Sequence, residues 1–244
     1  MHYNWNWGIL FALSPDGNTP YIDLLLSGLE WTVITGVCAW VLAFILGSII
    51  GVLRTLPSHT AERLGFVYVE FFRGIPLIVQ LFVWFFVLPD LLPVEWGSWI
   101  KQLRNGPFYT SVIGLAFFTS PRVAEQVRAG IQSLAGGQLR AALAMGLTRP
   151  QAYRYVLLPL AYRIILPTLT SEMLNCLKNT SVALTIGLME LTAQTRAMQE
   201  FSFQVFEAFS VSTLLYVLLN LAVVAGMRVV ERSAAIPGTL AKAR

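Results

Sequence analysis

Long apolar runs with almost no charge dominate this chain and restrict how it can fold. Only 12% of the residues are charged, about half the fraction usual in soluble domains. Each run is near or above the roughly 20 residues that a helix needs to cross the hydrocarbon layer of a bilayer. Backbone groups in lipid must bond within their own segment, and the alternating strands of a barrel are absent. The runs therefore predict an all-α integral membrane protein with about five spans, at Leu24–Leu53, Leu64–Leu88, Phe108–Val127, Tyr162–Leu188 and Phe206–Val230.

The positions of lysine and arginine predict the orientation of these spans. Five spans place most of the basic residues on one side of the membrane, whereas the other side receives only Lys101, Arg104 and Arg196. Basic residues concentrate in cytoplasmic loops, so we expect the N-terminus outside and the C-terminus inside. This divides the chain into an outer interfacial segment over 1–23, a membrane domain over 24–230 and a cytoplasmic tail over 231–244.

The longest predicted cytoplasmic loop covers residues 128–160 and has a helix–glycine–helix pattern. Gln138–Met145 is rich in alanine and leucine, which favour helix. Gly146 is placed to end that helix. Thr148 can cap a second short helix with Pro150 just inside its start, and we expect Pro159 to end it. The result is a short, basic and partly apolar pair of helices.

The spacing of residues in this loop resembles the cytoplasmic signature of bacterial ABC importer permeases, Glu-Ala-Ala-xxx-Gly-x9-Ile-x-Leu-Pro. The sequence departs from that signature at Arg140, where the family has glutamate, and at Val156, where it has isoleucine. In the family this loop is a coupling helix that rests in a groove of the ATPase subunit. The resemblance implies an ATPase-coupling role for Arg140, Ala141, Ala142, Gly146, Leu158 and Pro159.

Further segments are similar to polar amino-acid permeases, and most to those of glutamate/aspartate importers. They are Glu70–Gln80, Glu125–Gln138, Ala144–Pro159 and Lys178–Val182. The resemblance implies a type I ABC importer permease of the bacterial inner membrane, which moves glutamate or aspartate by alternating access. It also implies two ATP-binding subunits, a second and different permease subunit, and a periplasmic solute-binding protein as partners.

The chain contains no Gly-x-x-x-x-Gly-Lys-Ser/Thr phosphate loop. We therefore expect ATP and Mg²⁺ to bind to the partner ATPase and this chain to have no catalytic residues and no cofactor of its own. The two histidines, His2 and His59, are isolated, and no cluster has metal-ligand spacing. A membrane enzyme is therefore disfavoured, and a passive channel or scaffold would not need the helix–glycine–helix loop.

Several charged residues fall inside the predicted spans, where each costs roughly 2.5–3.5 kcal/mol on insertion scales. One interpretation pairs them on single helices, Glu70 with Arg73 and Arg122 with Glu125, at i,i+3 spacing. The other has them line a polar path for a zwitterion or an anion. The candidates for this substrate path are Arg73, Arg122, Glu125, Glu172, Asn175 and Asn179.

Three details of these spans refine the expectation. Arg73 precedes Gly74 and Pro76, which predicts a broken helix beside a guanidinium. Arg122 stands where the resembled family has a neutral residue, which favours an acidic substrate, although another polar or basic amino acid is the alternative. Gly47 and Gly51 form a small-xxx-small pair, which indicates close helix packing within the chain or a contact between subunits.

Overall fold

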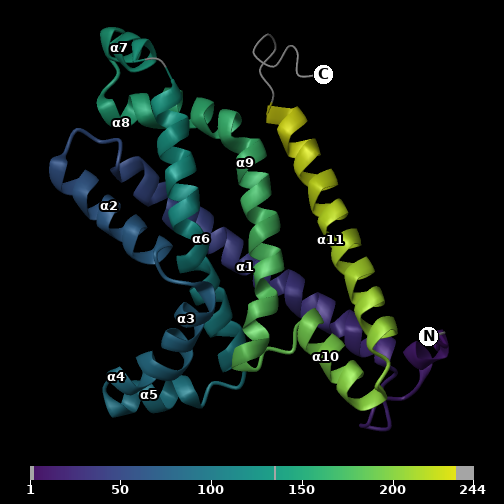
Figure 1. Cartoon of the computed structure of the whole chain (residues 1–244). Coiled ribbons are helices and arrows are strands. Elements are labelled where there is room, and N and C mark those ends of the chain that lie inside the picture. Colours follow the sequence, from purple (N-terminus) through teal and green to yellow (C-terminus); the bar gives the residue numbers. More distant parts are fainter. Residues whose placement is uncertain (1–2, 135, 235–244) are drawn as a thin grey trace. The chain divides into compact units, whose positions relative to one another are not determined.

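The computed structural model describes residues 3–134 and 136–234, and within them the chain is almost entirely helical (Figure 1). The one β-type pairing in these ranges is an isolated bridge between Leu13 and Pro20. The predicted all-α class is therefore confirmed. Of the predicted tail over 231–244, residues 235–244 lie outside the described part.

The chain divides into two compact units, and several long helices contribute to both. Unit 1 comprises Met1–Trp40, Pro76–Leu115 and Asn175–Leu221, and unit 2 comprises Val41–Ile75, Ala116–Leu174 and Ala222–Arg244. Along the chain the helical elements are η1 Trp7–Phe11, α1 Tyr21–Leu53, α2 His59–Arg73, α3 Leu77–Phe82, η2 Val83–Val87, α4 Leu88–Leu91, α5 Val94–Lys101, α6 Gly106–Ser133, α7 Gly137–Ala144, α8 Arg149–Ala152, η3 Tyr153–Leu157, α9 Leu158–Asn179, η4 Thr180–Ile186, α10 Leu191–Ser202 and α11 Val205–Ala234.

Helices α1 and α11 are long and apolar enough to cross a bilayer on their own, and the interrupted pair His59–Arg73 and Leu77–Leu91 passes the same test if it counts as one span. Many large apolar side chains of α1 and α11 are exposed, which suits contact with lipid rather than water. Examples are Ile45, Ile49, Leu214, Leu218 and Leu221. Helices α6 and α9 are also long and continuous, but charged residues interrupt their apolar sequence.

The break predicted after Arg73 is confirmed. Helix α2 ends at Arg73, where the amide of Gly74 donates to the carbonyl of Glu70 at 3.1 Å. Pro76 has φ −57° and ψ 143°, an extended conformation outside the helical region, and α3 begins at Leu77. Proline lacks the amide that a continuous helix would need at this point.

Two prolines that were expected to end helices do not do so. Helix α4 continues through Pro89 to Leu91, and α9 begins at Leu158 and continues through Pro159. In both cases a π-helical turn precedes the proline. The amide of the leucine after that turn donates to the carbonyl five residues earlier, from Leu88 to Val83 and from Leu158 to Tyr153. A regular α-helix would press the proline ring against the carbonyl four residues earlier, and the wider turn relieves this clash.

The two glycines of the small-xxx-small pair lie in unit 2, where α1 packs against α6. A Cβ on Gly47 would lie 2.7 Å from the carbonyl oxygen of Ser120, and one on Gly51 would lie 2.7 Å from that of Ala124. The backbones of the two helices therefore approach as closely as glycine allows. This confirms packing within the chain as the role of the pair.

Unit 1 has a core formed where α1, α10 and α11 meet. Its buried members are Tyr21, Leu25, Leu191, Met198 and Ala208. Helix α10 was not predicted, nor was α5, because both are short and lie in segments expected to be connecting loops.

Candidate functional site

The junction between α7 and α8 is fixed by a left-handed glycine. Gly146 has φ +86°, a conformation that glycine adopts without the penalty paid by other residues. The amide of Gly146 donates to the carbonyl of Leu143 at 3.0 Å, and that of Leu147 donates to the carbonyl of Ala142 at 3.1 Å. This is the Schellman pattern of helix termination, so the prediction that Gly146 ends this helix is confirmed.

The start of α8 is held as predicted. Thr148 is the N-cap residue and Pro150 lies in the first turn. The side-chain oxygen of Gln151 accepts hydrogen bonds from the amide of Thr148 at 2.8 Å and from its hydroxyl at 2.9 Å. The α7–α8 segment, Gly137–Ala152, is therefore a pair of short helices whose joint is locked at both ends, and Figure 1 shows the two helices next to each other.

The remaining members of the predicted coupling set lie on both sides of this joint. Arg140 is exposed, and its Nε donates to the carbonyl of Gly136 at 3.2 Å, one turn earlier on its own helix. Ala141 is exposed and Ala142 is buried. Leu158 and Pro159 lie in the first turn of α9, so Pro159 does not end the helix that α8 begins.

Tyr153 ties the end of this segment to another part of unit 2. Its ring is buried, and its hydroxyl donates to the backbone carbonyl of Thr55 at 2.8 Å. Thr55 lies in the turn between α1 and α2. Nothing in the sequence pattern indicated this contact, because it joins residues far apart in the chain.

Next to Thr55, a cluster of three charged residues joins α1 to α6. The guanidinium of Arg54 is paired with Glu125, and Arg128 donates to the same carboxylate from Nε at 2.9 Å and from Nη2 at 2.8 Å. The Arg54 side chain is only 8% exposed. Glu125 was proposed as a substrate contact or as the partner of Arg122, and the structure instead places it between two other arginines.

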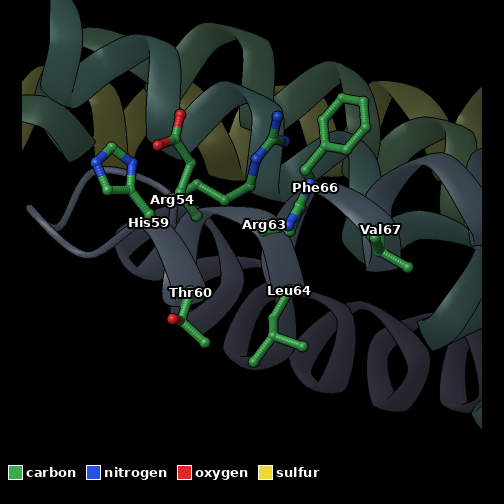
Figure 2. Close-up of a pocket in the computed structure, with 8 residues that line it drawn as sticks. Arg54, His59, Thr60, Arg63, Leu64, Phe66 and Val67 are labelled. Atoms are coloured by element: carbon green, nitrogen blue, oxygen red, sulfur yellow. The ribbon is translucent and has the colours of Figure 1, made fainter.

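A hollow of about 660 Å³ adjoins Arg54 along the first turns of α2 (Figure 2). Figure 2 shows the Arg54 guanidinium near the Phe66 ring, and the two are 5.9 Å apart from Cζ to ring centroid. Arg54 and Arg63 are the basic members of the lining, but Glu125 balances the first, and Glu62 also lines the hollow. The hollow therefore carries little net charge with which to hold an anion.

Arg122 and Glu172 form the second charged pair of unit 2. The guanidinium of Arg122, on α6, lies 3.9 Å from the carboxylate of Glu172, on α9, and over the Phe118 ring at 4.3 Å. The predicted pairing of Arg122 with Glu125 is therefore wrong, because the ion-pair partner of Arg122 is Glu172 on the neighbouring helix. The predicted pair of Glu70 with Arg73 is confirmed at 3.4 Å, and both side chains are exposed.

The two asparagines of the predicted substrate path belong to unit 1 and are not part of this charged pair. Asn175 and Asn179 lie on the last turns of α9 and are partly buried. The other predicted residues of the path, Arg73, Arg122, Glu125 and Glu172, belong to unit 2.

A buried carboxylate in unit 1 was missed by sequence reasoning, which placed Glu190 in a connecting loop. Its carboxylate caps α10 by accepting from the amides of Thr192 at 3.0 Å and Ala193 at 2.8 Å. It also accepts from the hydroxyl of Tyr216 on α11 at 3.0 Å. Burial raises the pKa of the Glu190 carboxyl, and the hydrogen bonds to the carboxylate oppose this shift. The available signal was a glutamate directly before a helix-prone segment.

Replacing Glu190 with alanine is expected to lower the stability of unit 1. The loss of an N-cap costs about 1–2 kcal/mol, and the partly buried hydroxyl of Tyr216 loses one of its two hydrogen-bond partners. Glu200→Ala on the same helix is the control, because Glu200 is exposed and makes only a surface pair with Arg196 at 3.7 Å. Thermal unfolding of the purified protein in detergent measures both, and equal melting temperatures would contradict the capping role.

Comparison with known proteins decides the family. Residues 43–236 match the family described as binding-protein-dependent transport system inner membrane component. The chain belongs to this family. The inner-membrane component is therefore a permease subunit of a transport system, and the α7–α8 segment, the Arg54–Glu125–Arg128 cluster and the Arg122–Glu172 pair all lie inside the matched region.

Relatives of this inner-membrane component include permeases for amino acids. The chain is 49% identical to the glutamate/aspartate import permease protein GltJ of Escherichia coli (strain K12), over 98% of this chain and 99% of that protein. It is 32% identical to the probable glutamine ABC transporter permease protein GlnM of Bacillus subtilis (strain 168), over 93% and 97%.

Solved structures agree with the family. A chain from the crystal structure of an amino acid ABC transporter with histidines is 30% identical, with a TM-score of 0.73 over 87% of this inner-membrane component and 95% of that chain. A chain of the MetNI methionine ABC transporter in an inward-facing conformation has a TM-score of 0.72 at 22% identity, over 88% and 98%. The second likeness shows a shared fold.

Proposed function

We propose that this permease subunit imports glutamate and aspartate across the bacterial inner membrane, driven by ATP hydrolysis on a partner protein. The observation that carries the substrate is the 49% identity to a glutamate/aspartate import permease over nearly the full length of both chains. The more distant relatives include glutamine permeases, so another polar or basic amino acid is the alternative substrate.

In this proposal the chain crosses the membrane about five times, with its N-terminus outside and its C-terminus inside. The membrane domain covers 24–230, an interfacial segment precedes it, and a cytoplasmic tail follows. The distribution of lysine and arginine supports this orientation. The α7–α8 segment then lies on the cytoplasmic side, where an ATPase can contact it.

The α7–α8 segment is the proposed coupling segment. Its joint is rigid because Gly146 closes α7 in a Schellman pattern and Gln151 holds the N-cap of α8. A rigid projection transmits displacement, whereas a flexible loop would absorb it. The proposed contact residues are Arg140, Ala141, Ala142 and Gly146, with Leu158 and Pro159 where the movement enters α9.

The proposed assembly contains this chain, a second and different permease subunit, two ATP-binding subunits and a periplasmic solute-binding protein. The family description, which names dependence on a binding protein, supports the last of these. ATP and Mg²⁺ bind to the ATPase subunits, whose closure moves the coupling segments and rocks the spans.

The Arg122–Glu172 pair is the proposed substrate-path element of unit 2. At 3.9 Å the two groups are close enough for ionic attraction but too far apart for a hydrogen bond, so the guanidinium keeps donors for a substrate carboxylate. Arg73 is a further proposed substrate-path residue of unit 2, and the partly buried Asn175 and Asn179 are proposed substrate-path residues of unit 1. The two arginines around Glu125 give that residue a structural role.

The substrate is tested with the complete transporter in liposomes. ATP hydrolysis is expected to rise when the binding protein is added with glutamate or aspartate, and labelled glutamate uptake should fall when unlabelled aspartate competes. Competition by arginine or histidine but none by aspartate would overturn the acidic substrate. An ATPase rate that ignores the loaded binding protein would overturn the importer itself.

A further inference from the structure

In unit 2, a partly buried side-chain hydrogen bond leads from the end of the α7–α8 segment to the turn between α1 and α2. Its donor is the hydroxyl of Tyr153, the first residue after α8, and its acceptor is the backbone carbonyl of Thr55 at 2.8 Å. The Tyr153 side chain is buried, with 8% of its surface exposed. Hydrogen bonds of this kind hold their two ends at a fixed separation.

The turn that receives this hydrogen bond is itself firmly held. The amide of Thr55 donates to the carbonyl of Val52 at 2.9 Å, which keeps the turn attached to the end of α1. The preceding residue, Arg54, is paired with Glu125 on α6. A Cβ on Gly65 of α2 would lie 2.5 Å from Cγ of Arg54, so α2 rests directly on this side chain. A displacement of Thr55 therefore acts on α1 and α2. It also acts on α6, because Arg54 connects the turn to that helix.

Tyr153 also lies in a special part of the backbone. It opens the π-helical turn η3, which continues directly from α8 and leads into α9. Turns of this kind occur in short pieces and often at functional sites. The coupling segment thus has a covalent connection to α9 through η3, whereas its connection to the α1–α2 turn depends on the Tyr153 side chain.

We propose that Tyr153 is a positioning residue that transfers the movement of the coupling segment to the α1–α2 turn. The inference rests on the proposed coupling function of the α7–α8 segment. When the segment moves, the Tyr153 hydroxyl pulls or pushes the Thr55 carbonyl, and α1 and α2 move together with α9. Without this hydroxyl, α9 moves alone and the spans rearrange incompletely. ATP is then hydrolysed with less transport.

Tyr153→Phe tests the inference because it removes one oxygen and keeps the ring that fills the buried site. Tyr155→Phe is the matched control, since it makes the same chemical change two residues away on a side chain that is 65% exposed. In the complete transporter in liposomes, we expect Tyr153→Phe to keep ATP hydrolysis within about twofold of the unmodified protein. The amount of glutamate moved per ATP should fall about threefold to tenfold, as expected for one lost hydrogen bond. An unchanged ratio would overturn the proposal.

A distance measurement separates this role from a general loss of structure. Spin labels at Thr60→Cys and Met145→Cys, both exposed positions in unit 2, report on the start of α2 next to the α1–α2 turn and on the coupling segment, with Cys38 and Cys176 replaced by alanine. With Tyr153 present, the separation of the labels should stay constant when ATP binds to the complete transporter. With Tyr153→Phe it should change on ATP binding, and a constant separation would contradict the transfer role. If the unmodified transporter does not move glutamate, the proposed substrate fails, but the label distances still test Tyr153.

Discussion

Gly146→Val is expected to reduce uptake more than tenfold while the protein still inserts into the membrane. Gly146 has φ +86°, and no atom lies within 4 Å of a Cβ built on it. The penalty therefore comes from the backbone alone, about 1–2 kcal/mol for an ordinary L-residue and more for a β-branched one. Relieving it would break the Schellman bonds and, in the proposed complex, move α7 away from its contact with the ATPase. Transport in liposomes and the quantity of protein in membranes measure the two effects.

Gly146→Asn is the matched control at the same position. Asparagine adopts the left-handed conformation more readily than most residues, and the open space accommodates its side chain. Most uptake should therefore remain. If the valine and asparagine variants transport equally well, the left-handed turn at Gly146 is not required for coupling.

The double variant Gly47→Ala, Gly51→Ala is expected to destabilise the packing of α1 against α6 and to lower the yield of folded protein. The added methyl groups would meet backbone carbonyl oxygens of Ser120 and Ala124, both at 2.7 Å. Backbone atoms of a helix cannot rotate away as a side chain can, so the helices must separate. Overpacking of this kind costs about 1–3 kcal/mol at each site. The readouts are the melting temperature in detergent and the fraction of monodisperse protein.

Gly226→Ala in α11 provides the comparison for this double variant. It is also a glycine inside a long helix, but no atom lies within 4 Å of its Cβ position. It should leave stability unchanged or raise it slightly, because alanine favours helix over glycine. A double variant as stable as Gly226→Ala would show that the close approach of α1 and α6 is dispensable.

Much of the fold could be predicted from sequence because its signals are local. The apolar runs, the break at Gly74 and Pro76, the left-handed Gly146 and the cap at Thr148 each depend on residues within one or two turns. The two prolines show the limit of this reasoning. Pro89 and Pro159 look like helix ends, but a π-helical turn before each one accommodates the ring, and no residue pattern in either segment marked such a turn.

The ion-pair partners that lie across helix interfaces could not be predicted from the sequence. These partners determine which charged residues come together in the candidate site. Arg122 and Glu125 have the spacing of a pair on one helix, yet Arg122 pairs with Glu172 on α9, and Glu125 pairs with Arg54, the residue directly after α1. Glu190 was unexpected for the same reason, since both α10 and α11 donate hydrogen bonds to a residue predicted to lie in a loop. Spacing along a helix shows which residues can meet, but tertiary packing selects among them.

The π-helical turn η3 also restricts how this region can change in evolution. A π turn holds one residue more than an α turn, so deleting a residue from Tyr153–Leu157 would restore regular helix without breaking the chain. The residues after the deletion would keep roughly their direction, because the wider turn had accommodated the one extra residue. However, Pro159 would again meet a carbonyl four residues earlier, which the wider turn now avoids. Changes in chain length should therefore be rare here and more frequent near Gly136 and Gly137, where a Cβ has space around it.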